Sequence, residues 1–139
     1  MKLGRFFDLA ATEGFKEIYR SARPSLGRSL KPYCLSILAT GVAGVAEELL
    51  GANNSVSAKL FHFAAWAGSV GSTGTAYLKT GWHYFKDATI RNPSISGDDA
   101  VGHGLAGGLL TGVPVATLNF AAYTGGRMLG KGINSILGN

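Results

Sequence analysis

The residue types that most often carry chemistry are few in this chain and widely spaced. The histidines are His62, His83 and His103, and Cys34 is the single cysteine. None of them stands in a metal-ligand spacing such as H-x-x-x-H or C-x-x-C, and a single cysteine excludes a disulfide within the chain. No nucleophile motif surrounds any serine. We therefore expect no catalytic residue, no metal site and no cofactor.

One glycine pattern, Gly102-x-Gly104-x-x-Gly107, matches the dinucleotide-binding fingerprint as a bare spacing. That fingerprint binds a pyrophosphate only where a buried strand leads into it and a helix opens from it. The residues before it read "NPSISGDD" and contain no apolar run that could be a central strand. The context therefore argues against nucleotide binding.

Two adjacent carboxylates, Glu47 and Glu48, follow an apolar run. Such residues could lie inside a membrane and form part of a proton path. They could also end a membrane span at the level of the lipid headgroups, and their position favours this second interpretation. The net charge of +5 does not indicate a nucleic-acid partner, because the basic residues gather near the N-terminus without a recognition motif.

The elements that must position these residues are apolar and poor in charge. The chain has 139 residues, of which 46% are hydrophobic, 15% are charged and 21 are glycine, whereas a water-soluble domain carries about 25% charged residues. Uncharged runs of 15, 19 and 27 residues separate Lys31 from Glu47, Lys59 from Lys79, and Asp99 from Arg127. A membrane-spanning helix needs about 20 predominantly apolar residues, so these runs predict membrane spans.

The third run is too long for one span, and Pro114 is its natural dividing point because proline disrupts a helix interior. We therefore predict an all-α membrane protein whose domain, residues 32–139, contains four short glycine-rich transmembrane helices. The last two would cover residues 98–112 and 114–137, after a mixed-charge connection at residues 79–99. The alternative is a soluble, glycine-rich helical protein.

The N-terminal segment, residues 1–31, consists of an amphipathic stretch and a basic linker. Its apolar side chains follow helical spacing, and those at the centre of the stripe are Phe6, Phe7, Phe15, Ile18 and Tyr19. This pattern predicts a helix that lies in the membrane interface or docks on a partner. A cleaved mitochondrial presequence is the alternative, but three acidic residues interrupt the basic face, which favours retention.

Glycines at positions 104, 108 and 112 recur every fourth residue and share one helix stripe. Small residues at this spacing allow two helix backbones to approach closely inside a bilayer. We therefore predict a helix-packing seam on this stripe. Its expected facing surfaces are Gly68, Gly71 and Gly74 in the second span and Gly126 and Gly130 in the fourth.

These features together resemble the Tim-type translocase family of the mitochondrial inner membrane. The residues that carry the resemblance are a small residue and an aromatic late in the second span, an arginine and acids in the connection, and a glycine cluster in the third span: Gly74, Tyr77, Arg91, Asp98, Asp99, Gly107, Gly108 and Gly112. The spacings from Tyr77 to Arg91 and from Arg91 to Asp98 are longer than in the family pattern. The resemblance covers roughly residues 33–132.

Within this family the chain is most similar to the small four-helix accessory subunit of respiratory complex I. The resemblance implies a non-catalytic subunit of the mitochondrial inner membrane that stabilises the membrane arm, with other membrane subunits and lipids as partners. A subunit of a protein-import translocase is the first alternative, and a small carrier is the second. Charge distribution would place the termini in the matrix, whereas the family resemblance implies the intermembrane space.

Overall fold

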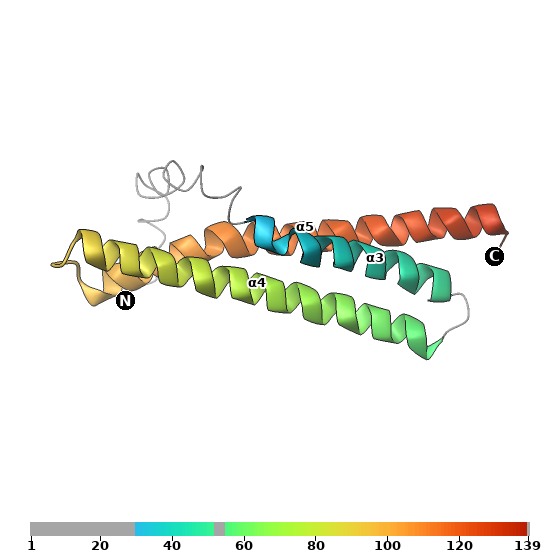
Figure 1. Cartoon of the computed structure of the whole chain (residues 1–139), viewed down its shortest axis with the longest axis horizontal. Helices are drawn as coiled ribbons and strands as arrows, with labels where there is room; N and C mark the ends of the chain where they lie inside the picture. The colour runs from blue at the N-terminus through green and yellow to red at the C-terminus, as the bar shows by residue number, and fades with distance from the viewer. Residues whose placement is uncertain (1–29, 52–54, 139) are drawn as a thin grey trace. The chain divides into compact units, whose positions relative to one another are not determined.

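The computed structural model describes residues 30–51 and 55–138, and most of these residues are helical, with no strand among them. A short 3-10 turn, Lys31–Tyr33, leads into α3, which covers Cys34–Gly51. Helix α4 covers Val56–Arg91, and α5 covers Gly97–Leu137 (Figure 1). The all-helical class predicted from the sequence is confirmed for this part of the chain. The predicted interfacial helix, including Phe6, Phe7, Phe15, Ile18 and Tyr19, lies outside the described residues.

In the part of the chain that the structure describes, two helices are long and apolar enough to cross a membrane. They are the segment Lys31–Gly51, with a mean hydropathy of 1.5 over its best window, and α5, with 1.4. Helix α4 contains the predicted second span but does not meet this criterion, because serine, threonine, glycine and charged residues dilute its apolar side chains.

The predicted division at Pro114 is wrong, since α5 continues through this proline as one helix of 41 residues. An interior proline costs a helix about 3 kcal/mol, so packing must offset it. Thr111, Val115 and Asn119 lie four residues apart on both sides of Pro114, and all three are buried. A break at the proline would rotate Val115 and Asn119 out of line with Thr111.

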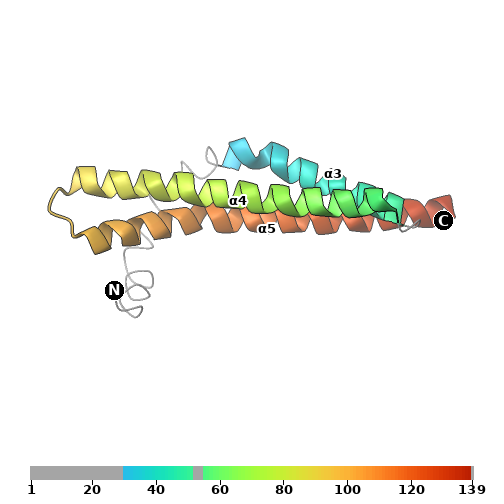
Figure 2. The same cartoon turned by 90° about the horizontal axis from the view of Figure 1, so that it is seen from below.

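The predicted connection at residues 79–99 is also mostly helical. Helix α4 ends at Arg91, and the following Asn92 precedes Pro93, which disfavours the α conformation for Asn92. A tight turn follows, in which the amide of Ile95 donates to the carbonyl of Asn92 at 3.0 Å. Only about five residues therefore separate α4 from α5, and this places the two helices in a hairpin (Figure 2).

The chain forms two compact units, which we describe separately. Among the described residues, the hairpin unit contains Gly74–Val113, and its core is the end of α4 against the beginning of α5. The three-helix unit contains Pro32–Thr73 and Pro114–Asn139, and so joins α3 to the beginning of α4 and the end of α5.

Small and polar side chains occupy the interior, and large apolar side chains face outward. Among the described residues, the buried apolar side chains are five alanines and Val115, and the buried polar side chains are Thr40, Thr111 and Asn119. By contrast, Leu38 and Val42 of α3 are both 67% exposed, and Phe120 of α5 is 72% exposed. This distribution is the reverse of that in a water-soluble domain, where leucine, valine and phenylalanine supply the core.

Candidate functional site: two packing seams and a polar cluster

The glycine stripe of α5 packs closely on α4 in the hairpin unit. A Cβ atom built on Gly104 would lie 3.1 Å from the carbonyl oxygen of Gly81, and one built on Gly108 would lie 2.9 Å from that of Tyr77. Because both obstacles are backbone atoms, a side chain could not be accommodated by a rotamer change. Gly107 lies against the ring of Tyr84, and Gly112 is buried. We call this contact the hairpin seam.

The surface that faces the stripe differs from the predicted one. A Cβ built on Gly68, Gly71 or Gly74 would meet no described atom within 4 Å. The short turn after Arg91 sets the register of the two antiparallel helices. In this register Gly108 lies opposite Tyr77, and Gly104 lies opposite Gly81. This register brings Gly81 opposite the stripe, and sequence spacing alone does not reveal it.

A second seam joins α3 to α5 in the three-helix unit. A Cβ on Gly44 would lie 2.5 Å from the carbonyl oxygen of Tyr123, and one on Gly126 would overlap the carbonyl of Gly41. A Cβ on Gly130 would lie 3.0 Å from the carbonyl oxygen of Val45. Gly126 and Gly130 therefore face α3. They cannot face the stripe of Gly104 and Gly108, because all four glycines belong to the single helix α5. The small residues of "TGVAG" at positions 40–44 were the available signal for this α3 seam.

A buried polar contact links all three helices of this unit. Asn119 of α5 is 0% exposed, and its Nδ2 donates to Ser72 Oγ of α4 at 3.0 Å. The hydroxyl of Thr40 in α3 lies 3.1 Å from Asn119 Oδ1 and 2.7 Å from the carbonyl oxygen of Ser36, and donates its proton to one of them at a time. In turn, Ser72 Oγ donates to the carbonyl of Ser69 at 3.1 Å.

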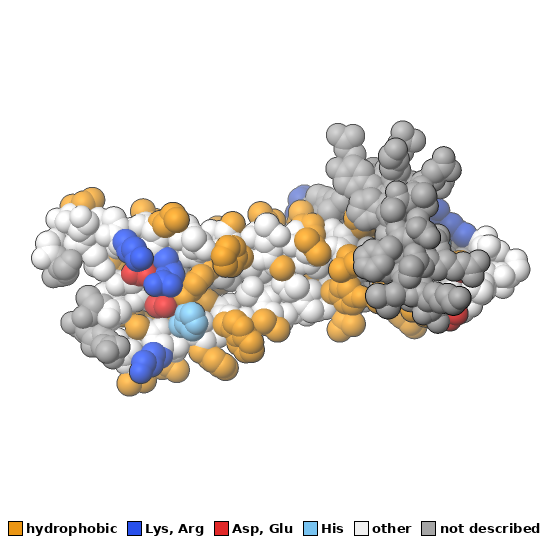
Figure 3. All heavy atoms as spheres, turned by 180° about the vertical axis from the view of Figure 1, so that it is seen from behind, with side chains coloured by type: hydrophobic (Ala, Val, Ile, Leu, Met, Phe, Trp, Pro, Cys, Tyr) orange, Lys and Arg blue, Asp and Glu red, His pale blue; other side chains and the backbone are white. Residues whose placement is uncertain are grey.

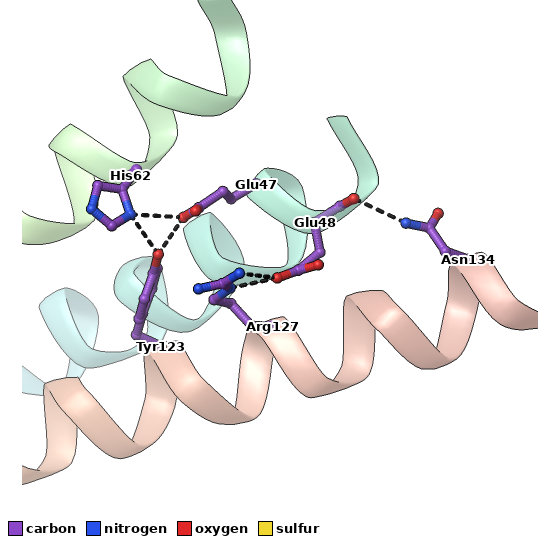
Figure 4. Close-up of polar contacts among 6 residues, drawn as sticks. All are labelled: Glu47, Glu48, His62, Tyr123, Arg127 and Asn134. Atoms are coloured by element: carbon purple, nitrogen blue, oxygen red, sulfur yellow. Dashed lines mark hydrogen bonds and ion pairs between the residues drawn. The ribbon is translucent and has the colours of Figure 1, made fainter. Parts of the chain in front are cut away.

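Further along the same unit, Glu47 of α3 meets side chains from the other two helices (Figure 4). The hydroxyl of Tyr123 donates to Glu47 Oε2. His62 Nδ1 of α4 lies 3.2 Å from the same carboxylate oxygen and 2.7 Å from the Tyr123 hydroxyl. The rings of His62 and Tyr123 meet edge to face at 5.9 Å. Each helix therefore contributes one side chain to this contact.

The neighbouring carboxylate, Glu48, binds α5 through Arg127 and Asn134. Arg127 Nε and Nη2 both approach Glu48 Oε1 at 2.5 Å, and Asn134 Nδ2 donates to the Glu48 carbonyl at 2.9 Å. The Arg127 guanidinium also lies 5.9 Å from the centre of the Tyr123 ring. We refer to Glu47, Glu48, His62, Tyr123, Arg127 and Asn134 as the polar cluster.

An open cavity of about 370 Å³ adjoins the polar cluster. Its lining combines the last turn of α3, the first turns of α4 and one residue of α5: Glu47, Glu48, Gly51, Ser55, Ala58, Lys59, His62 and Arg127. The cavity therefore carries two carboxylates and two permanent cations. Figure 3 shows acidic, basic and histidine side chains gathered in one patch that hydrophobic side chains border.

The charged residues of the family resemblance make local contacts. Arg91 pairs with Asp87, one turn earlier in α4, at 3.0 Å. Asp99 pairs with Ser96 at the start of α5, where the Asp99 amide donates to Ser96 Oγ and the Ser96 hydroxyl donates to Asp99 Oδ2. Asp98 lies in the first turn of α5. In the described part of the chain, Arg91 therefore pairs with neither Asp98 nor Asp99.

Gly102, Gly104 and Gly107 lie inside α5, without a preceding strand in the described residues, so the structural context of a dinucleotide site is missing. The described residues contain no group of three or more His, Cys, Asp or Glu side chains that could hold a metal ion. Comparison of the chain with protein families, curated proteins and solved structures finds no match. Its own geometry must therefore carry the functional argument.

Proposed function

We propose that this chain is a non-catalytic, multi-pass membrane subunit that stabilises a larger membrane complex by packing against neighbouring subunits. The observation that carries the proposal is the placement of side chains: the interior is alanine, glycine and hydrogen-bonded polar groups, and leucine, phenylalanine and tryptophan face outward. Lipid solvates large apolar side chains, so helices in a bilayer associate through close backbone contact and buried hydrogen bonds. The two seams and the Thr40–Asn119–Ser72 contact supply both.

We further propose that the complex is mitochondrial respiratory complex I (NADH:ubiquinone oxidoreductase) and the membrane is the mitochondrial inner membrane. This assignment rests on the resemblance of Tyr77, Arg91, Asp98, Asp99 and the Gly107–Gly108 pair to the family pattern. The contacts of Gly107 with Tyr84 and of Gly108 with Tyr77 give the aromatic and glycine positions of that pattern a packing role. Arg91, Asp98 and Asp99 would then act by ending α4 and starting α5.

The test is extraction and co-purification of the tagged chain. We expect it to remain in the membrane pellet after alkaline carbonate treatment and to migrate in native gels with NADH dehydrogenase activity after mild detergent solubilisation. Release by carbonate would contradict membrane integration. Co-purification with translocase subunits, together with crosslinks to precursor proteins in transit, would replace complex I by the import machinery.

A further inference from the structure

The cavity beside the polar cluster is lined by a defined pattern of charges. Lys59 and Arg127 offset Glu47 and Glu48, so the formal charge of the lining is zero when His62 is neutral. The two carboxylates would repel an anion, and Lys59 and Arg127 would repel a cation. A ligand that carries both signs a few ångströms apart would match it.

The charged side chains of the lining still have atoms that could bind a ligand. Arg127 binds Glu48 through Nε and Nη2 and directs them at a single oxygen, Oε1. Glu47 likewise receives Tyr123 and His62 on one oxygen, Oε2. Within the described residues, Lys59 makes no ion pair. One carboxylate oxygen on each glutamate and the Lys59 ammonium therefore remain for a ligand.

The position of the cavity indicates a lipid. Glu47 and Glu48 lie in the last turn of α3, and Lys59 in the first turns of α4, so the cavity lies at the end of a segment that is long enough to cross a membrane. Leu60 and Phe63 follow the lining residues Lys59 and His62 in α4, and each is 62% exposed. An amphiphile can place its acyl chains on this apolar surface and its headgroup in the cavity.

We propose that this cavity binds the zwitterionic headgroup of a phospholipid with a primary ammonium, of the phosphoethanolamine type. The Lys59 ammonium would bind the phosphate, and the free oxygens of Glu47 and Glu48 would accept hydrogen bonds from the lipid ammonium. A phosphocholine headgroup has the same charges but no N–H donors, so it cannot make the second set of bonds. An anionic headgroup such as phosphoglycerol would place an uncompensated negative charge beside the two carboxylates. The inference rests on the proposed membrane location but not on the identity of the complex.

The test measures lipid retention by the purified full chain in detergent, using native mass spectrometry with equimolar phosphatidylethanolamine, phosphatidylcholine and phosphatidylglycerol. We expect phosphatidylethanolamine to be retained about tenfold over each of the others, the factor that corresponds to one charge-assisted hydrogen bond of about 1.4 kcal/mol. Soluble phosphoethanolamine should compete poorly because it lacks acyl chains. Equal retention of the three lipids would overturn the proposal, and so would full displacement by equimolar soluble phosphoethanolamine.

Two substitutions separate the roles of the lining. Lys59→Gln should lower retention of all three lipids several-fold and leave their order unchanged, because the phosphate contact is common to them. Glu47→Gln should reduce the preference for phosphatidylethanolamine over phosphatidylcholine several-fold, since it removes one of the two charges that bind the ammonium but keeps an oxygen for Tyr123. Lys79→Gln, a lysine outside the cavity lining, is the matched control and should behave as the unmodified chain.

A chain that resists carbonate extraction but shows no headgroup preference would contradict this inference and leave the proposed function intact. A chain that carbonate releases would contradict the proposed function itself. If neither Lys59→Gln nor Glu47→Gln changed lipid retention, any lipid preference would belong to another surface, and the proposed site would be wrong. Each variant must elute as the unmodified chain does on size exclusion, and Lys79→Gln supplies the reference for that comparison.

Discussion

At the scale of single residues, the contacts of the buried Asn119 predict that replacing its acceptor, Ser72, destabilises the chain more than replacing Asn119 itself. Asn119→Leu removes its bonds to Thr40 and Ser72, yet both hydroxyls keep a backbone acceptor one turn away. We expect this change to lower the free energy of unfolding by about 1 kcal/mol, given about 0.6 kcal/mol per interhelical hydrogen bond. Ser72→Ala instead leaves the fully buried Nδ2 group without its acceptor, which costs about 1–3 kcal/mol. Unfolding in mixed micelles should rank Ser72→Ala as the more destabilising change, and the opposite order would contradict this account.

The Glu48–Arg127 ion pair is the second test at this scale. Glu48 is 14% exposed and Arg127 is 41% exposed, so solvent or headgroups screen part of the attraction. We expect a double-mutant cycle with Glu48→Gln and Arg127→Gln to give a coupling energy of about 1 kcal/mol, so that the double variant is less destabilised than the sum of the two single variants. The measurement is the free energy of unfolding of all four chains in the same micelles. A coupling energy near zero would show that the pair does not stabilise the contact between α3 and α5.

At the scale of elements, a glycine inside a seam and a glycine outside both seams predict opposite effects for the same substitution. Glycine to alanine in an open helix interior stabilises the helix by about 0.8–1.0 kcal/mol. At Gly68 the added Cβ meets nothing described within 4 Å, so Gly68→Ala should raise the thermal midpoint slightly or leave it unchanged. At Gly108 the Cβ would lie 2.9 Å from a backbone oxygen, so Gly108→Ala should lower it, and Gly108→Leu should prevent assembly. Thermal unfolding in detergent checks both, and equal midpoints for the two alanine variants would exclude a seam at Gly108.

The start of α5 and the end of α4 provide another matched pair. Ser96 accepts a hydrogen bond from the Asp99 amide and donates to the Asp99 carboxylate, so it acts as the N-cap of α5. Ser96→Ala should therefore destabilise the chain by about 1 kcal/mol. The Arg91–Asp87 pair is exposed, with Arg91 75% accessible, and such pairs contribute at most about 0.5 kcal/mol. Arg91→Ala should accordingly have less than half the effect of Ser96→Ala on the free energy of unfolding. An effect of Arg91→Ala as large as that of Ser96→Ala would contradict the small contribution expected of an exposed ion pair.

At the scale of the whole molecule, the outward-facing apolar side chains distinguish a membrane protein from a soluble one. Leu38 lies near the middle of the segment Lys31–Gly51 and is 67% exposed, whereas Ile136 lies at the end of α5 and is 86% exposed. An aspartate at the centre of a span costs about 2.5–3.5 kcal/mol for insertion, and the cost falls near the interface. Leu38→Asp should therefore block carbonate-resistant integration while Ile136→Asp permits it. Normal integration of Leu38→Asp would place α3 outside the lipid.

The sequence by itself determined the helical class, the apolar character and the small-residue packing stripe. These follow from composition and from the 3.6-residue period, which any helix made of these residues must obey. It also located Glu47 and Glu48 near the end of an apolar segment and placed Gly104 and Gly108 on one stripe. Such properties depend on residues close together in the chain, so local physical chemistry is enough to predict them.

Only the tertiary structure decided which surfaces meet. Pro114 predicts a helix boundary locally, but the buried stripe of Thr111, Val115 and Asn119 favours one continuous helix. The facing surface of Gly104 and Gly108 depends on the register of the hairpin, and the turn after Arg91 sets that register. The contacts of Glu47 with His62 and Tyr123 join residues that are 15 and 76 positions apart, so no spacing motif could reveal them. Long-range pairs of this kind arise from the packing of helices, and a periodic pattern in one helix does not specify its partner.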